Sequence, residues 1–241
     1  MRVLHLFAQC FNYGLLFFYL IAVARPCAAD DPGTVFTRIY EQGEKDWGSA
    51  GGGSGPGSTL DYTRHVRSLL FNFITHRGVK TMVDAPCGSF HWMPTLLRRL
   101  ERSHHALDEY TGLDVVESII EVSKITYVNT SSWHFRVADL TKDDLPKGKD
   151  LILSRDALQH LSFEQVKLAL KAYQRAAPRY LLVGSYPWNT ENRDIATGDY
   201  NAINLMRPPF DLWPEEIFNE ETPDHKHLLL FTQAQIAQWT L

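Results

Sequence analysis

The chain has 241 residues, of which 44% are hydrophobic and 22% are charged, and its formal net charge at pH 7 is −4. These values predict one globular domain with a sizeable core, and they exclude an intrinsically disordered chain. The slightly acidic balance also lacks the basic surface that nucleic-acid binding needs.

The first thirty residues have the layout of a secretory signal. Arg2 gives a positive start, residues 13–24 are an apolar run, and small residues at 27–29 precede Asp30. This pattern predicts a signal peptide over residues 1–29. A membrane span needs about 20 residues, so the run is short for one, but an uncleaved signal anchor stays open as the alternative.

A glycosylation motif agrees with this interpretation. Asn129 begins the triplet Asn-Thr-Ser, an acceptor for N-glycosylation that is used only in the secretory pathway. We therefore expect the protein in the ER or Golgi lumen or outside the cell. Of the three cysteines, the mature chain would keep only Cys87, which we expect to be a packing residue rather than a nucleophile.

Residues 30–58 form an N-terminal segment ahead of the main domain. A short helix is expected at about 35–40, and residues 50–58 read AGGGSGPGS. A flexible linker would have this composition. However, Trp47 lies just before the glycines, and the SerThrLeuAsp pattern at 58–61 predicts a helix start, so the segment can instead close over a ligand.

Residues 59–241 alternate between strand and helix patterns, which predicts a Rossmann-like, doubly wound α/β fold. Its sheet would be mostly parallel, with helices on both faces. A late strand without a long helix before it is expected to pair antiparallel at the sheet edge. The expected strands are 80–85, 110–114, 133–138, 150–154, 180–185 and the late strand 227–232; the expected helices are 59–76, 92–100, one from about 117, and 163–176; residues 192–210 are expected to be a long loop.

The stretch TMVDAPCGSFHW at 81–92 is the first strand, a tight turn and the opening of a helix. Pro86 and Gly88 force the turn, and Gly88 leaves bare backbone for a ligand to approach. Pro94 suits the first turn of the helix. In an open α/β sheet, ligands bind at the carboxyl ends of the strands, so this turn is a candidate binding site.

Three successive strands end in the acids Asp84, Asp114 and Asp139. Each alone could be a helix cap. Together they suit a nucleoside, since Asp114 follows the glycine turn at the spacing of a ribose-binding acid. A dinucleotide needs a G-x-G-x-x-G turn for its diphosphate. An acid opening the turn would repel a diphosphate but tolerate the positively charged amino and sulfonium groups of S-adenosylmethionine.

Six segments carry a resemblance to the class I S-adenosylmethionine-dependent methyltransferases, within a small methyltransferase-like subgroup of undefined substrate. They are WGSAGGGSGPGS, VDAPCGSFHWM, TGLDVV, ADLTKDDLP, LSRDALQHLS and NRDIATGDYNAINLMRPPFDL, and together they span about residues 36–231. The superfamily's E/D-x-G-x-G-x-G turn is reduced to one glycine here.

The resemblance implies a role for each matching position. Those expected to bind the donor are Asp84, Ala85, Pro86 and Gly88 around the methionine part, Asp114 at the ribose, Asp139 and Leu140 at the adenine, Trp47, Gly55 and Gly57 as a cap, and Arg155 beside the transferring methyl group.

Candidate catalytic residues follow the fourth strand. Asp156 and His160 are four residues apart and would share one face of a helix, where the carboxylate could orient the imidazole as a general base. The alternative is that Asp156 caps the helix and His160 packs in the core. Asn192 and Arg193 could hold the substrate, or Arg193 could belong to a structural network with Asp194.

The function we predict is methyl transfer from S-adenosylmethionine to an oxygen or nitrogen acceptor. A secretory-pathway glycan is preferred because Tyr186, Trp188 and Tyr200 suit a sugar, and a secreted protein or small metabolite remains open. The alternatives are a pseudo-enzyme that binds the nucleoside without turnover and an NAD-dependent oxidoreductase, which the missing glycine turn disfavours. No metal-binding cluster is visible, and the sequence does not predict the oligomeric state.

Overall fold

A computed structural model describes residues 31–42 and 50–241. The predicted signal peptide and Trp47 lie outside the described residues. Among the described residues, every helix is too short or too polar to cross a membrane.

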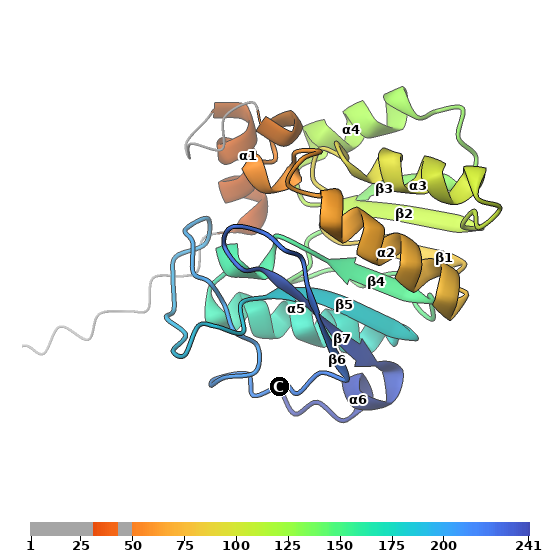
Figure 1. The fold of residues 1–241 in the computed structure, drawn as a ribbon. Coiled ribbons are helices and arrows are strands. Elements are labelled where there is room, and N and C mark those ends of the chain that lie inside the picture. The colour runs from red at the N-terminus through yellow and green to blue at the C-terminus, as the bar shows by residue number, and fades with distance from the viewer. Residues whose placement is uncertain (1–30, 43–49) are drawn as a thin grey trace, which may run out of the picture.

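The described residues form one seven-stranded sheet in the order β3-β2-β1-β4-β5-β7-β6 (Figure 1). Neighbouring strands are parallel except around β7, which is antiparallel to β5 and to β6. The predicted mostly parallel sheet is confirmed, and the late strand is antiparallel as predicted. The sequence did not predict β6, and it takes the edge position beyond β7. The strands are β1 (Thr81–Asp84), β2 (Glu109–Asp114), β3 (Trp133–Val137), β4 (Leu151–Ser154), β5 (Tyr180–Ser185), β6 (Glu216–Asn219) and β7 (His227–Thr232).

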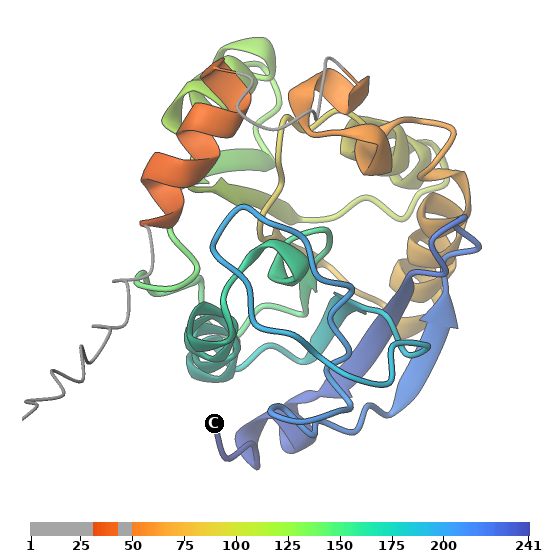
Figure 2. The same ribbon diagram turned by 90° about the vertical axis from the view of Figure 1, so that its left-hand side faces the viewer.

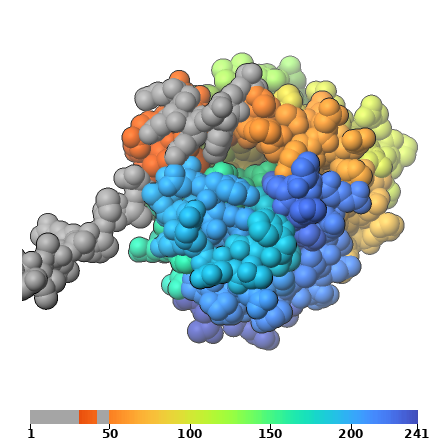
Figure 3. Space-filling model, turned by 60° about the vertical axis from the view of Figure 1, so that its left-hand side comes forward, coloured from red at the N-terminus to blue at the C-terminus, as the bar shows by residue number. Residues whose placement is uncertain are grey.

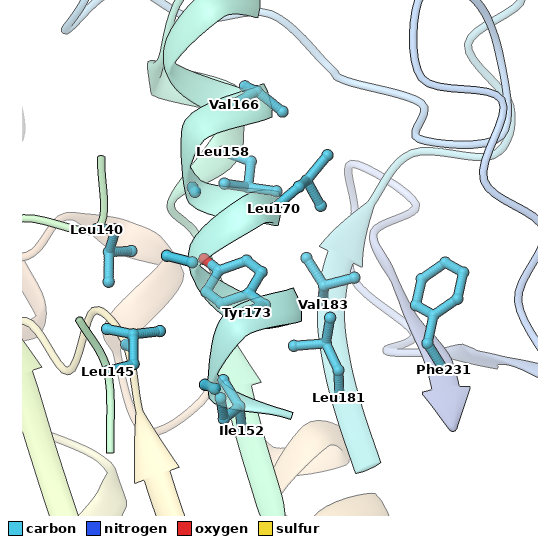
Figure 4. Packing of buried hydrophobic residues seen from close by; sticks show 14 of the residues in the cluster. Leu140, Leu145, Ile152, Leu158, Val166, Leu170, Tyr173, Leu181, Val183 and Phe231 are labelled. Carbon is cyan, nitrogen blue, oxygen red and sulfur yellow. The ribbon is translucent and has the colours of Figure 1, made fainter. Parts of the chain in front are cut away.

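Helices cover both faces of the sheet, and each face has its own apolar core. One core contains α2 and α3, and the other contains α5 and α6. In the second core, Tyr173 of α5 points toward the sheet between Leu145 and Val183 (Figure 4), and its hydroxyl lies 2.7 Å from Ser154 Oγ. The helices are α1 (Pro32–Gln42), α2 (Arg64–Arg77), α3 (Met93–Arg102), α4 (Glu117–Thr126), α5 (Phe163–Ala176) and α6 (Gln233–Ala237).

The start of α2 corrects a prediction. The helix begins at Arg64 rather than near residue 59, because the preceding residues fold back on themselves. The Ser58 hydroxyl donates to the Ser54 carbonyl at 3.4 Å instead of capping a helix, and Thr59 Oγ1 donates to the Pro56 carbonyl at 3.0 Å. These bonds fix the route of the chain into the glycine-rich loop (50–58).

The strand order places the expected ligand-binding crevice between β1 and β4. The chain winds from β1 through β2 to β3 in one direction, and from β4 to β5 in the other. At such a reversal the loops leaving the two adjacent strands diverge and leave a crevice at their carboxyl ends. Figure 2 looks onto this edge and shows α1, the glycine-rich loop and the loops between β5 and β7 arranged around it.

Candidate active site

A cavity of about 290 Å³ opens at the carboxyl ends of β1, β2 and β4. Figure 3 shows it as a recess between the orange residues of the glycine-rich loop and the blue residues of the C-terminal loops. Most of the predicted site residues line this one cavity. They are Gly55, Gly57, Asp84, Pro86, Gly88, Asp114, Asp139, Leu140, Arg155, Asp156 and His160.

The turn after β1 contains a buried acid, and its backbone amides already donate hydrogen bonds to protein acceptors. Asp84 is buried and accepts a hydrogen bond from the Tyr110 hydroxyl at 2.8 Å. Burial raises the pKa of Asp84 to about 7, although the Tyr110 bond and Arg155 oppose the shift. The amides of Cys87, Gly88 and residue 89 all donate to protein acceptors. None of these three amides is therefore available to bind a diphosphate. This argues against a dinucleotide as the ligand.

Asp114 ties the second strand to this turn. Its Oδ2 accepts from the Gly88 amide and its Oδ1 from the Val116 amide, both at 3.0 Å. Burial raises the pKa of Asp114 to about 6, while these backbone bonds act in the opposite direction. The carboxylate is thus held rigidly at the cavity wall, where a ribose hydroxyl can donate to its remaining lone pairs.

Asp139 lies beyond β3 in a similar hydrogen-bonded turn. Its Oδ1 accepts from the Thr141 amide at 2.8 Å and from the Thr141 hydroxyl at 2.7 Å. Lys142 Nζ lies 3.1 Å from Oδ2 and also pairs with Asp31, which immediately precedes α1. Lys142 therefore fastens the start of α1 beside the predicted adenine position.

The glycine-rich loop is bound to the β1 turn. Ser54 Oγ accepts from the Ser89 amide at 2.9 Å and lies 2.7 Å from the Tyr40 hydroxyl, and Ser89 Oγ donates to the Gly51 carbonyl at 2.8 Å. Gly88 has a φ of +56°, and a Cβ there would lie 2.7 Å from Ser54 Oγ. The loop is therefore part of the cavity wall rather than a spacer. The β1 turn needs glycine at position 88, where it contacts this loop.

At the other end of the cavity, Asp156 accepts three donors. Arg155 Nη1 lies 2.7 Å from Oδ2, Gln159 Nε2 lies 2.9 Å from Oδ1, and Lys226 Nζ also donates to Oδ1. Burial alone would raise the pKa of Asp156, but the charges of Arg155 and Lys226 outweigh it and hold the pKa far below its usual range. Asp156 is therefore a permanent carboxylate and a weak proton acceptor.

The expected helix shared by Asp156 and His160 does not form. Asp156 has a φ of +57° and precedes the short 3₁₀ helix Leu158–His160. The His160 ring instead places Nδ1 2.9 Å from the Asp199 carbonyl oxygen. A carbonyl can only accept, so Nδ1 carries the proton and Nε2 holds the lone pair of the neutral ring. Both residues still line the cavity, and their catalytic roles stay predictions.

Ion pairs that the sequence does not predict hold this end of the cavity together. Arg155 Nε donates to Glu220 at 2.9 Å, and Arg155 Nη1 donates to the Gly57 carbonyl at 3.0 Å. Glu220 is fully buried and Lys226 is 3% exposed. One signal could have found Lys226: it immediately precedes an expected antiparallel strand, whose first residues lie at the carboxyl edge of the parallel ones.

An aromatic cluster surrounds Lys226. The Tyr62 hydroxyl donates to Asp224 Oδ1, and the Tyr186 hydroxyl donates to Oδ2 at 3.4 Å. Trp188 Nε1 donates to the Asp224 carbonyl at 3.0 Å. Tyr62, Tyr186, Asp224 and also Tyr200 line the cavity, whereas Trp188 does not.

Three predicted residues do not reach the cavity. Ala85 is fully buried, and its amide donates to the Leu153 carbonyl, so it supports the sheet. The Asn192 side-chain amide donates to the carbonyls of Asn204 and Pro208, and these hydrogen bonds stabilise the loop that contains it. Arg193 lies exposed on the same loop.

Two further predictions concern residues beside the site. Asp194 accepts from the Phe163 amide at 2.7 Å and so caps the start of α5. Cys87 is buried at the cavity wall, and its burial raises the pKa of the thiol well above the usual range. Among the described residues, no group of three or more His, Cys, Asp or Glu side chains could hold a metal ion.

Comparison with known proteins identifies the fold. No family model matches the chain, and no curated protein matches it. Solved structures do match, at low sequence identity. Magnesium protoporphyrin IX methyltransferase (ChlM) from Synechocystis PCC 6803 with bound SAM aligns with a TM-score of 0.58 and 14% identity, over 84% of this chain and 97% of that one. The chain has a class I methyltransferase fold.

Two further structures share this fold. Burkholderia thailandensis 1,6-didemethyltoxoflavin-N1-methyltransferase, with 1,6-didemethyltoxoflavin and S-adenosylhomocysteine bound, has a TM-score of 0.58 and 15% identity over 82% of this chain and 85% of that one. The methyltransferase domain of bacterial CtHen1-C has a TM-score of 0.52 and 16% identity over 72% and 98%. At these identities the likeness establishes the fold alone.

Proposed function

We propose that the protein is an S-adenosylmethionine-dependent methyltransferase acting on an oxygen or nitrogen acceptor. One observation carries the proposal: Asp84, Asp114 and Asp139, from three different strand ends, line one cavity at the switch point of the sheet. The bound SAM and S-adenosylhomocysteine in structures of the same fold support it.

The residues of the cavity suit this donor. Asp84 and Asp114 are buried carboxylates that gain from a nearby positive group, and the donor carries an ammonium and a sulfonium. Asp114 can accept from ribose hydroxyls, and Asp139 and Leu140 border the position proposed for the adenine. When bound, the donor supplies the electrophilic methyl group, and the protein contributes chiefly alignment of the two reactants.

His160 is the residue we assign as general base. Its Nδ1 points at the Asp199 carbonyl, so Nε2 is the nitrogen able to take a proton from the acceptor. Asp156 is held as a carboxylate by Arg155 and Lys226, and it acts through its charge on the site. His160 is thus the proposed base, and Asp156 contributes a fixed negative charge rather than a proton acceptor.

Ligand discrimination tests the donor assignment. A ligand that binds only the folded state raises the unfolding temperature by mass action. We expect S-adenosylhomocysteine to raise it and NADH to leave it unchanged, with no change in NADH fluorescence. Stabilisation by NADH alone would overturn the proposal. Stabilisation by S-adenosylhomocysteine without turnover on a broad acceptor panel would instead indicate a pseudo-enzyme.

For the cellular setting, we propose the secretory pathway and a glycan acceptor. The apolar N-terminal run and the Asn129 triplet support the location. Asn129 is exposed and lies between α4 and β3, at the edge of the sheet opposite the cavity, so a glycan there would leave the cavity open. In secretory cells, we expect Ser131→Ala to remove a mobility shift that peptide N-glycosidase also removes. A wild-type chain without glycan at Asn129 would count against this location.

A further inference from the structure

We propose that the acceptor group is an uncharged hydroxyl rather than an amine, and that Lys226 sets this preference. The inference rests on the proposed function and narrows its acceptor. It comes from the end of the cavity that lies beyond Arg155 and Asp156, where Lys226, Tyr62, Tyr186 and Asp224 meet. We call these four residues the lysine box.

A side-chain ammonium of the protein occupies the lysine box. Lys226 Nζ donates to Asp156 and lies 3.8 Å from Asp224 Oδ2. It also lies 5.2 Å from the centre of the Tyr62 ring and 6.0 Å from that of Tyr186. Aromatic faces beside carboxylates form the kind of site that attracts a cation. Here Lys226 takes that position, so a substrate ammonium would meet a like charge.

The carboxylates around the box are already engaged. Both oxygens of Asp156 accept donors from Arg155, Gln159 and Lys226. Both oxygens of Asp224 accept from tyrosine hydroxyls. Arg155 adds a second buried positive charge behind Asp156. These partners reduce the attraction that the carboxylates would otherwise exert on a protonated amine.

A hydroxyl acceptor fits the same charges. An oxygen lone pair forms the new bond to the methyl carbon, the pair of the broken carbon–sulfur bond stays on sulfur, and His160 Nε2 takes the hydroxyl proton and later releases it to water. The oxygen gains negative charge as its proton leaves, and a fixed ammonium close by stabilises that charge. A protonated amine has no lone pair to attack with and would first have to lose a proton to the medium.

The first test measures charge preference without an acceptor. Sinefungin carries an ammonium where S-adenosylmethionine carries the methyl sulfonium, so its affinity relative to S-adenosylhomocysteine reports the potential at the transfer position. We expect Lys226→Met to shift this ratio by at least about fivefold in favour of sinefungin. Lys226→Arg, which keeps the charge, and Lys149→Met, whose lysine pairs with Glu109 at the opposite edge of the sheet, should leave it unchanged. An unchanged ratio in Lys226→Met would overturn the role of Lys226.

The second test uses the wild-type protein and therefore does not depend on a variant folding. Methyl-tritiated S-adenosylmethionine is incubated with methyl glycosides and with the matched amino sugars, and the labelled atom is located by mass spectrometry. Label on hydroxyl oxygens supports the inference, and label on amines alone overturns it. If neither is labelled, the sinefungin ratio decides. Failure of the wild-type protein to bind S-adenosylhomocysteine would instead refute the proposed function itself.

Discussion

Arg155→Met tests whether the buried charges hold the Asp156 end of the cavity together. Arg155 makes two contacts of 2.9 Å with Glu220, one of 2.7 Å with Asp156 and one of 3.0 Å with the Gly57 carbonyl. Methionine keeps most of the volume but leaves Glu220, which is fully buried, without its cationic partner. Breaking a buried ion pair in this way costs about 3–5 kcal/mol. That is a large share of the roughly 5–15 kcal/mol by which domains are stable.

Urea denaturation measures this cost. With a slope of about 3 kcal/mol per molar, a loss of about 3–5 kcal/mol lowers the midpoint by about 1 to 1.7 M. Arg155→Met combined with Glu220→Gln removes the stranded charge, so the double variant should be more stable than Arg155→Met alone, with a coupling energy of about 2 kcal/mol. A midpoint within about 0.3 M of wild type for Arg155→Met, or strictly additive effects, would show that the Arg155–Glu220 ion pair does not stabilise the fold.

Three further predictions concern the donor site and the base. Gly88→Ala combines a φ of +56° with a Cβ only 2.7 Å from a serine hydroxyl, so we expect about 2–3 kcal/mol of destabilisation and about tenfold weaker binding of S-adenosylhomocysteine. Gly148→Ala is the matched control, because its φ is +63° and nothing lies within 4 Å; an equal effect on binding there would contradict the close approach. Burial raises the pKa of Asp84 to about 7 and that of Asp114 to about 6, and the ligand ammonium favours their ionised forms. Affinity for S-adenosylhomocysteine should therefore rise several-fold from about pH 5.5 to about pH 8, with a flatter profile in Asp84→Asn, whereas a falling profile would show that these acids do not face the ligand. His160→Gln should lower methyl transfer by at least about 100-fold while its affinity for S-adenosylhomocysteine, measured by calorimetry, stays within about threefold. Undiminished transfer would remove His160 as the base.

The features that the sequence predicted best are those set by local pattern. The strand ending at Asp84 and the helix opening at Pro94 combine an apolar run with turn residues, and both form close to where they were expected. The alternation of such units predicts a parallel sheet, and the ligand edge follows from topology. The pattern and topology together therefore predict that the strand-end acids meet at one edge of the sheet.

The features that the sequence did not predict depend on contacts between residues that are distant in the chain. The helix expected from residue 59 starts at Arg64, because the Ser58 hydroxyl bonds to the loop before it rather than to a helix amide. Asn192 was expected at the substrate, but its amide bonds to carbonyls of its own loop. Glutamate is seldom fully buried unless it is paired, and Glu220 is fully buried because Arg155 pairs with it from another strand end.

The role of Lys226 in the site is likewise not predictable from the sequence alone. Its position before an antiparallel strand indicates the edge of the sheet but not its partner, Asp156, which lies 70 residues earlier in the chain. Only the folded chain brings the two together with the Tyr62 ring.

Asp114, the acid at the end of β2, is the residue on which the proposed S-adenosylmethionine site depends most. Calorimetric titration with S-adenosylhomocysteine tests it most directly, using the chain from Asp30 onward as wild type, Asp114→Ala and Asp108→Ala. Asp108 is exposed and precedes the same strand at its opposite end, so it controls for the loss of a carboxylate. We expect wild type and Asp108→Ala to bind S-adenosylhomocysteine and Asp114→Ala to lose binding. Equal binding by all three proteins, or no binding by folded wild type, would contradict this expectation.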